Sequence, residues 1–556
     1  MKLFEGFKVK GKPFFPLGAQ SHNSSTYTPL MFSESVKAAL ALNCNTVEAP
    51  VYWEIVEKNE GFFDFSCVDF MVKMCREAGL KLVVLWFASW KNGDMSYTPE
   101  WVKSDQSRFQ RVLRSDGTPV TCLSAHYEAN RIADSKAFNA LIAHIKKIDQ
   151  NEGTVIAVQI ENEPGFFKTD RDFSPKALEN LEKNVPSKFL DYLEGKKNVP
   201  AYKFWQENGL KKNASWFDSF GFHGYEFCEA WHLALYIDEI AAAAKQVYDI
   251  PMYVNVWLIA PQNWGVPGME YPGGGAVERT LHVWLAASDH LDLIAPDIYE
   301  ANCYRYEHIV DFYGTGENAL FVPEAALDPV GACNIFNAIA RGTAGYAFFG
   351  SESCFAASDK STDNRDLTEN ALPVRDSNLA VKNAMSLILK HGKDCRLNLP
   401  EPNQKGKIFP VVPHTGQNDQ GYEFEKFLGR VNFNNAGRHD YSSRRMKMTE
   451  GQLMPRGLIF EDEPYLFYLA GMFNLQLVPK KSPNVSMIAN APFIADFLSV
   501  EEGLFDENGN FVASRKRNGD EVFFGGFWVT PDCGIVRVRL VPSSLSVPSV
   551  LLAPLT

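Results

Sequence analysis

Two glutamates, each close to the end of an apolar run, have the residue type and placement best suited to catalysis. Glu163 lies in the string QIENEPG (159–165), and Glu324 lies in FVPEA (321–325). A pair of carboxyl groups suits cleavage of a glycosidic bond, because one donates a proton to the leaving oxygen while the other attacks or stabilises the oxocarbenium-like centre. The two need different environments, since a carboxyl walled by aromatics stays protonated near neutral pH and one held by hydrogen bonds stays ionised.

The alternative interpretation is that Glu161 and Glu163 only form ion pairs at a strand end. The combination of Asn-Glu-Pro at 162–164 with a second strand-end glutamate, Glu324, favours catalysis. Side chains alternate along a strand. If Glu163 points into an active-site mouth, Glu161 is therefore expected to point the same way one step deeper, as a buried and paired residue.

The elements that must position these glutamates are repeated β-α units, because short apolar runs alternate with amphipathic helical stretches. The expected strands are 16–20, 45–51, 81–87, 154–160, 252–258, 291–299, 319–325 and 345–350. Eight strands with intervening helices predict an α/β fold of the TIM (β/α)8 barrel type, whose active site forms at the carboxyl ends of the strands. The open doubly wound alternative is disfavoured, because the sequence has neither a G-x-G-x-x-G string nor a Walker string.

Helical periodicity marks three clear segments between or after these strands. Segment 66–79 is expected to begin with Ser66 as its cap and to end at Gly79, segment 135–149 repeats the scheme, and 376–391 is expected to be the last barrel helix. Beyond about residue 395 the sequence changes to prolines, Gly-Asn turns and short alternating runs such as DEVFFGGFWV and GIVRVRLV. We therefore predict a catalytic barrel over 1–395 and an antiparallel β-sandwich domain over 396–556.

Composition limits the class of partner and the compartment. The net charge of -12 disfavours non-specific nucleic-acid binding, and a neutral or weakly charged substrate suits it better. The first residues, MKLFEGFKVKGKPFFPLG, contain no apolar core of signal-peptide length, and no later run reaches the roughly 18 to 20 apolar residues that span a bilayer. The ten cysteines include no Cys-x-x-Cys pair, which favours buried free thiols and a reducing, cytoplasmic setting.

The sequence resembles a known group of enzymes. The Asn-Glu pair after the fourth strand and the glutamate after the seventh look like the retaining clan A glycoside hydrolases. Within that clan, VYWEIVEKNEGFFDF (51–65) is similar to the strand-two signature of the β-galactosidase families 35 and 42, and the likeness continues through 86–102 and Asp-Ile-Tyr at 297–299. It extends into the β-rich tail and so covers most of the chain.

The resemblance implies roles for four residues. Glu163 would be the acid/base and Glu324 the nucleophile, Asn162 would bind the sugar 2-hydroxyl, and Tyr299 would touch the nucleophile and help to keep it ionised. Asn162 has the alternative of capping the next helix, and Tyr299 of being an ordinary core tyrosine. The two carboxyl groups of a retaining enzyme are expected about 5 to 5.5 Å apart, whereas a gap near 8 Å would indicate inversion.

Three departures from the family pattern bear on the substrate. Family 35 enzymes usually carry Cys-Ala-Glu-Trp after strand three, and this sequence has Phe-Ala-Ser-Trp at 87–90. Pro50 replaces the strand-two tyrosine, and the His-Glu-Pro string is reduced to Val-Glu-Lys at 56–58. The hydrolytic residues are retained, but recognition of galactose does not follow from them.

Aromatic side chains near strand ends suit a sugar site, because the C–H faces of sugars stack on such rings. Trp86 is the expected platform, since strand three should open into the mouth there, and Trp257 is a second candidate. Gln20 and Asn23, after strand one, are expected to add polar contacts. Each of these aromatic residues has packing in the core as its alternative role.

The resulting prediction is a retaining, exo-acting β-glycosidase that resembles β-galactosidases and takes an oligosaccharide or glycoside substrate. A transglycosylase or a β-glucoside-specific enzyme with the same glutamates is the enzymatic alternative, and a non-catalytic glycan-binding barrel is the alternative from another class. No cofactor or metal is expected, because no His-x-His or His-Glu-x-x-His string occurs and the esterase string Gly-x-Ser-x-Gly is missing. A homo-oligomer is compatible with the sequence.

Overall fold

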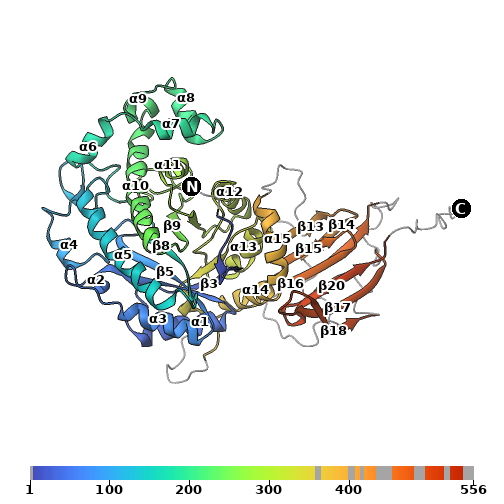
Figure 1. Ribbon diagram of the computed structural model, residues 1–556. Helices are drawn as coiled ribbons and strands as arrows, with labels where there is room; N and C mark the ends of the chain where they lie inside the picture. The colour runs from blue at the N-terminus through green and yellow to red at the C-terminus, as the bar shows by residue number, and fades with distance from the viewer. Residues whose placement is uncertain are drawn as a thin grey trace.

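Seven parallel strands form a curved sheet in the N-terminal part of the chain (Figure 1). The computed structural model describes residues 4–356, 365–397, 407–413, 419–433, 454–480, 495–518, 522 and 526–542. In order around the sheet the strands are β10 (Leu293–Asp297), β9 (Met252–Trp257), β8 (Val155–Asn162), β5 (Lys81–Lys91), β4 (Thr46–Tyr52), β3 (Leu17–Gln20) and β11 (Tyr346–Phe349). Neighbours in space are neighbours among the expected strands, as a barrel requires.

The segment expected as the seventh strand, 319–325, closes the ring between β10 and β11. The Ile298 N–H donates to the carbonyl of Glu324 at 2.9 Å, and the Ala347 N–H donates to the carbonyl of Val322 at 2.9 Å. Isolated parallel bridges join the same two edges. This segment places Glu324 on the barrel rim, and the predicted TIM barrel is confirmed.

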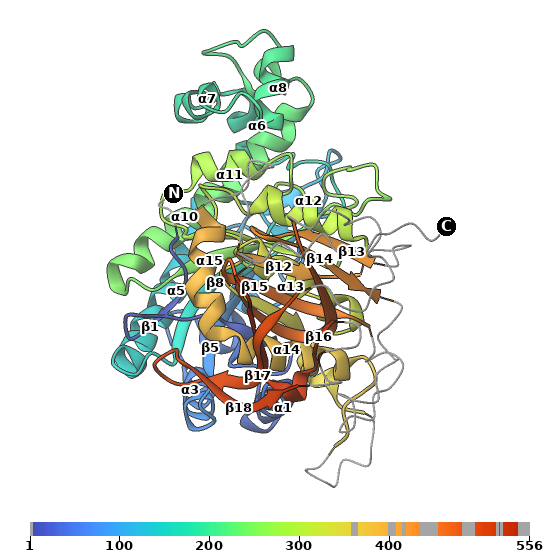
Figure 2. The ribbon, with the colours of Figure 1, turned by 90° about the vertical axis from the view of Figure 1, so that its right-hand side faces the viewer.

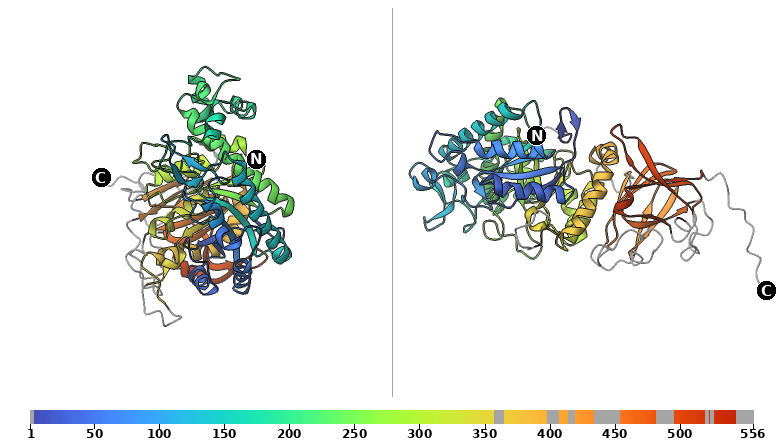
Figure 3. Two further views of the ribbon diagram at one scale, coloured as in Figure 1. Left: turned by 90° about the vertical axis from the view of Figure 1, so that its left-hand side faces the viewer. Right: turned by 90° about the horizontal axis from the view of Figure 1, so that it is seen from below.

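Helices flank the parallel strands, as the view from below shows (Figure 3). They are α1 (Pro29–Ala41), α3 (Ser66–Glu77), α5 (Glu128–Asp149), α10 (His223–Val247), α11 (Leu281–Ala287), α12 (Cys303–Tyr313) and α13 (Pro329–Ala340). Helices α6 (Pro175–Glu182), α7 (Ser187–Glu194), α8 (Pro200–Glu207) and α9 (Trp216–Phe220) form an excursion that projects from the barrel in Figure 2. Shorter elements are β1 (Lys8–Val9), β2 (Lys12–Pro13), β6 (Arg111–Leu113), β7 (Pro119–Leu123), α2 (Trp53–Val56), α4 (Glu100–Ser104) and the 3-10 helix η1 (Ser351–Cys354).

Three of the expected helix boundaries are wrong. The helix expected over 135–149 begins earlier, since α5 starts at Glu128. Helix α3 begins at Ser66 itself, with Phe65 in the capping position, and the Asp64 carboxylate accepts the Ser66 N–H at 2.9 Å. Its end agrees with expectation, because Gly79 has φ of 72°, a conformation that glycine adopts without steric cost. The single helix expected over 376–391 is two helices, α14 (Ala371–Asn383) and α15 (Met385–Leu397), which break at Ala384.

The C-terminal part is an antiparallel β-sandwich, as predicted. Its strands are β12 (Ile408–Val411), β13 (Asp419–Glu423), β14 (Phe427–Asn432), β15 (Arg456–Glu463), β16 (Leu466–Pro479), β17 (Phe497–Phe505), β18 (Phe511–Arg517), β19 (Phe527–Val529) and β20 (Ile535–Leu540), with a 3-10 turn η5 (Pro531–Cys533). Strand β16 belongs to both layers, because 466–472 pair with β15 and 473–479 pair with β14 and β19. Apolar side chains fill the space between the layers. The run DEVFFGGFWV lies partly outside the described residues.

Helices α14 and α15 lie between the barrel and the sandwich (Figure 1). Arg456, at the start of β15, is 2% exposed and reaches α14. Its Nε donates to the Ser377 hydroxyl at 2.8 Å, and its Nη2 donates to the Pro373 carbonyl at 3.2 Å. These buried charge-assisted hydrogen bonds fix the sandwich against the barrel helices.

All ten cysteines are free thiols, and all except Cys533 are buried. The expected class of cysteine, a buried unpaired thiol, is therefore confirmed. Within the described ranges, no helix is both long enough and apolar enough to cross a membrane.

Gly224, in the first turn of α10, allows the close approach of α9. A Cβ atom at Gly224 would lie 2.1 Å from the Trp216 carbonyl oxygen, so we expect Gly224→Ala to destabilise the barrel by about 1 to 3 kcal/mol or more. Gly392 in α15 is the matched control, since a Cβ there would meet no atom within 4 Å and alanine is the better helix former by about 1 kcal/mol. The measurement is the midpoint temperature of thermal unfolding of each variant. Equal midpoint temperatures for the two variants would contradict the packing argument.

Candidate active site

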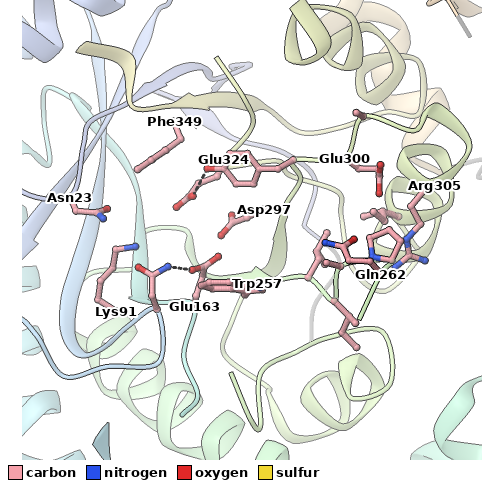
Figure 4. Close-up of a pocket in the computed structure, with 18 residues that line it drawn as sticks. Asn23, Lys91, Glu163, Trp257, Gln262, Asp297, Glu300, Arg305, Glu324 and Phe349 are labelled. Atoms are coloured by element: carbon pink, nitrogen blue, oxygen red, sulfur yellow. Dashed lines mark hydrogen bonds between the residues drawn. The ribbon is translucent and has the colours of Figure 1, made fainter. Parts of the chain in front are cut away.

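A cavity of about 620 Å³ opens at the carboxyl ends of the barrel strands (Figure 4). Glu163 and Glu324 both line it and are 7% and 6% exposed. Their carboxyl groups come from β8 and from the segment that closes the barrel, on different sides of the hollow in Figure 4. The two glutamates singled out from the sequence therefore meet in one site.

The backbone around Glu163 leaves regular strand geometry. Glu161 and Glu163 have φ of 62° and 45°, in the left-handed region that non-glycine residues rarely adopt. The Glu163 N–H donates to the Asn255 side-chain oxygen at 2.8 Å, and the Asn92 amide donates to the Glu163 carboxyl. Strain of this kind persists only where the surroundings hold it, and here it aims the Glu163 side chain into the cavity.

Glu161 does not point the same way as Glu163, contrary to the expectation from strand alternation. Its carboxyl accepts the N–H groups of Ser89 at 3.2 Å and Trp90 at 2.8 Å, and burial together with the nearby Asp134 of helix α5 raises the pKa of Glu161 well above its ordinary value. The positive φ values at 161 and 163 interrupt the alternation. Glu161 is fully buried and paired, as predicted, and it holds the end of β5 beside the site.

Glu163 is suited to donate a proton. Burial and the neighbouring Glu324 raise the pKa of Glu163 to about 7, although the Lys91 ammonium opposes this shift. A carboxyl with such a pKa is protonated over part of the neutral range and can also lose its proton during a reaction.

Glu324 is held by two hydrogen-bond donors. The Tyr299 hydroxyl donates to Oε2 at 2.9 Å, and the Asn162 amide donates to Oε1 at 3.4 Å. Burial and the charge of Glu324 raise the pKa of Tyr299, so the tyrosine remains a donor. Donors to a carboxylate favour its ionised form, and that is the state a nucleophile needs.

Lys91, at the end of β5, is linked to Glu324 through Asn162. Its ammonium donates to the Asn162 side-chain oxygen at 2.8 Å and so orients the amide that reaches Glu324. Lys91 is 7% exposed and lines the cavity. Its positive charge offsets part of the repulsion among the buried carboxyl groups.

Of the other residues expected at the site, Asn23 and Trp257 line the cavity. Trp257 is 36% exposed and stands edge-on to Phe167, with ring centroids 5.7 Å apart. It offers an aromatic face on which a sugar ring can stack.

Trp86 is not a sugar platform. It is fully buried, packs against Phe138 of α5 and donates from its indole nitrogen to Asp134 at 2.9 Å. Alternation along β5 explains this, because Leu85 and Phe87 point into the barrel while Trp86 points out toward the helices.

The prediction that Gln20 contacts the sugar is also wrong. It is 1% exposed and donates to the Pro323 carbonyl at 3.2 Å, so it fixes the backbone before Glu324 and does not line the cavity. Burial also raises the pKa of the neighbouring Glu48 well above its ordinary value.

Four polar residues of the site were missed. Lys91 and Asn92 were missed because β5 continues to Lys91, beyond the expected end at 87. Asn255 is a polar residue inside the apolar run MYVNVW, and Asp297 ends β10 in the string APDIY. Polar residues at or near strand ends were the signal that would have identified Asn255 and Asp297.

Comparisons with known proteins give matches to both parts of the chain. Residues 6–267 match the family described as glycosyl hydrolases family 35, and residues 399–527 match a domain of unknown function, DUF5597. The sequence is 29% identical over 174 residues to a β-galactosidase of Xanthomonas manihotis, covering 30% of this chain and 26% of that protein. It is 26% identical over 200 residues to the human β-galactosidase-1-like protein 3, covering 35% of this chain and 28% of that protein. The matched regions thus span about a quarter of these relatives.

Among solved structures, the β-galactosidase from the psychrophilic Marinomonas ef1 aligns with a TM-score of 0.47 and 12% identity. The alignment covers 69% of this chain and 62% of that chain. This structural similarity is weak, so the likeness to β-galactosidases is supported by the sequence matches alone.

The hydroxyl of Tyr299 is expected to contribute to catalysis through Glu324. We expect Tyr299→Phe to lower kcat by about tenfold to a hundredfold, the equivalent of a hydrogen bond of about 1.5–3 kcal/mol to a charged group. Tyr192→Phe is the matched control, because the Tyr192 hydroxyl donates to the Glu317 carboxylate at 3.0 Å outside the cavity. Equal kcat values for the two variants in steady-state assays would contradict this role.

Proposed function

Because residues 6–267 place this chain among the β-galactosidase-like glycoside hydrolases of clan A, we propose that the protein is a retaining, exo-acting β-glycosidase. The observation that carries the proposal is a pair of buried glutamates with different surroundings in one cavity. Burial and negative charge favour a proton on Glu163, while two hydrogen-bond donors hold Glu324. This difference is what a two-step glycosidase needs.

In the first step, Glu324 attacks the anomeric carbon while Glu163 gives its proton to the departing oxygen. The glycosidic bond breaks, and a covalent glycosyl-enzyme forms at Glu324. In the second step, the Glu163 carboxylate takes a proton from water, whose oxygen attacks the same carbon and releases Glu324. The sugar leaves with its original anomeric configuration after two inversions.

The glycone is proposed to be a β-linked sugar, with galactose first among the candidates because the relatives are named β-galactosidases. Pro50 and the string Phe-Ala-Ser-Trp at 87–90 depart from the family's sugar-binding pattern. A β-glucoside-specific enzyme and a transglycosylase use the same two glutamates. An added acceptor sugar distinguishes a transglycosylase from a hydrolase, since a transglycosylase then forms a longer product.

A non-catalytic glycan-binding barrel is the alternative from another class. The strained backbone at Glu163 and the donors arranged around Glu324 argue against it, because binding alone needs no pair of buried carboxyl groups with such different surroundings. A reducing, cytoplasmic location and a homo-oligomeric state remain predictions.

Substitution of each glutamate tests the proposal. On an aryl β-glycoside identified by a substrate screen, we expect Glu324→Gln to abolish turnover and Glu163→Gln to lower kcat by about 10²- to 10⁴-fold, the usual contribution of general acid-base catalysis. Glu179→Gln is the control, because Glu179 pairs with Lys176 outside the cavity and its replacement should leave kcat nearly unchanged.

The configuration of the first-formed sugar tests the retaining mechanism. Proton NMR of the fresh product should show the β-anomer before mutarotation. An α-anomer would mean inversion, and full activity of Glu324→Gln would remove the proposed nucleophile.

A further inference from the structure

A third carboxyl group lies in the cavity, and the two-glutamate mechanism gives it no role. Asp297 ends β10, is 4% exposed and lines the cavity together with Glu163 and Glu324. Figure 4 shows its carboxyl beside those of both glutamates. An unpaired buried carboxylate is costly, so its presence here needs a physical account.

One amide joins Asp297 to Glu163. The Asn255 side-chain oxygen accepts the Glu163 N–H at 2.8 Å, and the Asn255 Nδ2 donates to Asp297 Oδ2 at 2.7 Å. Asn255 is 1% exposed, so both contacts are shielded from water. Asp297 is therefore fixed relative to the backbone of Glu163.

The Asp297 side chain lies beside the carboxyl groups of Glu163 and Glu324 in the cavity (Figure 4). In the described part of the chain, no N–H or hydroxyl group donates to Asp297 Oδ1, which is buried. The Asp297 and Glu163 carboxyl groups interact, and each affects the pKa of the other. Two ionised carboxylates side by side repel each other, whereas a proton on one of them removes the repulsion and lets that group donate a hydrogen bond to the other.

The surroundings favour the proton on Asp297. Burial, Glu324 and Glu163 raise the pKa of Asp297 well above its ordinary value, although the Lys91 ammonium and the hydrogen bond from Asn255 oppose this shift. A hydrogen bond from a protonated Asp297 would lower the pKa of Glu163. The titratable groups that interact with Asp297 from the surrounding elements are Lys91, Glu163, Tyr253, Tyr299, Tyr313 and Glu324.

We propose that Asp297 is a positioning residue, a neutral acid whose Oδ1–H donates to the carboxylate of Glu163. The proposal rests on the acid/base role of Glu163 in the proposed function. Asp297 keeps its proton throughout the cycle. Its hydrogen bond strengthens when Glu163 has given up its own proton and weakens when Glu163 recovers one from water. Asp297 thus stabilises the form of Glu163 that activates water in the second step.

Two substitutions distinguish this neutral donor from an ionised neighbour. Asp297→Asn preserves the geometry, because an asparagine oxygen can accept from Asn255 while its N–H donates to Glu163. Asp297→Val removes the donor at similar size. The readout is the alkaline limb of the pH profile of kcat/KM, which reports the pKa of Glu163, since activity is lost as pH rises through it.

We expect Asp297→Asn to leave the alkaline limb in place and kcat within about tenfold of wild type. Asp297→Val should move the limb upward by about one pH unit, because the ionised form of Glu163 loses a hydrogen bond, and should lower kcat by more than Asp297→Asn does. Asp149→Asn is the structural control, since Asp149 is 2% exposed, pairs with Arg76 and lies outside the cavity, so it should change thermal stability without moving the limb.

A downward shift of one unit or more in Asp297→Asn would overturn the proposal, because it would show that an ionised Asp297 had been raising the pKa of Glu163. An unmoved limb in a folded Asp297→Val variant would overturn it as well. Failure of the proposed function looks different: Glu163→Gln would then keep the alkaline limb, and both proposals would fall.

Discussion

Mutual repulsion among buried carboxyl groups is the interaction on which this site depends. Glu163, Asp297 and Glu324 lie in one cavity at less than a tenth exposure each, where water screens their charges poorly. All three cannot ionise together without a large cost in free energy. Two hydrogen-bond donors stabilise Glu324, and the Lys91 ammonium supplies a positive charge nearby. The surroundings raise the pKa values of Glu163 and Asp297, which favours a proton on each.

The barrel makes this arrangement by bringing the ends of separated strands together. Glu163, Asn255 and Asp297 come from β8, β9 and β10, which are adjacent in the sheet, so one asparagine can contact both acids. Glu324 completes the ring from the closing segment, whose carbonyl accepts from Ile298 of the neighbouring strand. The left-handed backbone at Glu163 then turns its side chain toward the others.

The sequence was sufficient for the barrel, the sandwich and the two glutamates, because these depend on hydrophobic periodicity and on strand ends. The sequence was insufficient to predict which way a side chain points, because a shift of one residue along a strand reverses that direction. Trp86 points outward because its neighbours Leu85 and Phe87 fill the barrel interior, and Glu161 turns away because the backbone leaves strand geometry after 160. Asp297 was visible only as part of a family-like string, since its role depends on groups that are distant in the chain.

The proposed mechanism depends most directly on a covalent bond between the sugar and Glu324. The fluorine of a 2-deoxy-2-fluoro glycoside slows both steps, and a good leaving group speeds only the first, so the intermediate accumulates. Peptide mass spectrometry of the treated protein should locate the added fluorosugar on Glu324, with none on Glu324→Gln. A label on Glu163 or Asp297, or turnover without any adduct, would contradict the assigned nucleophile.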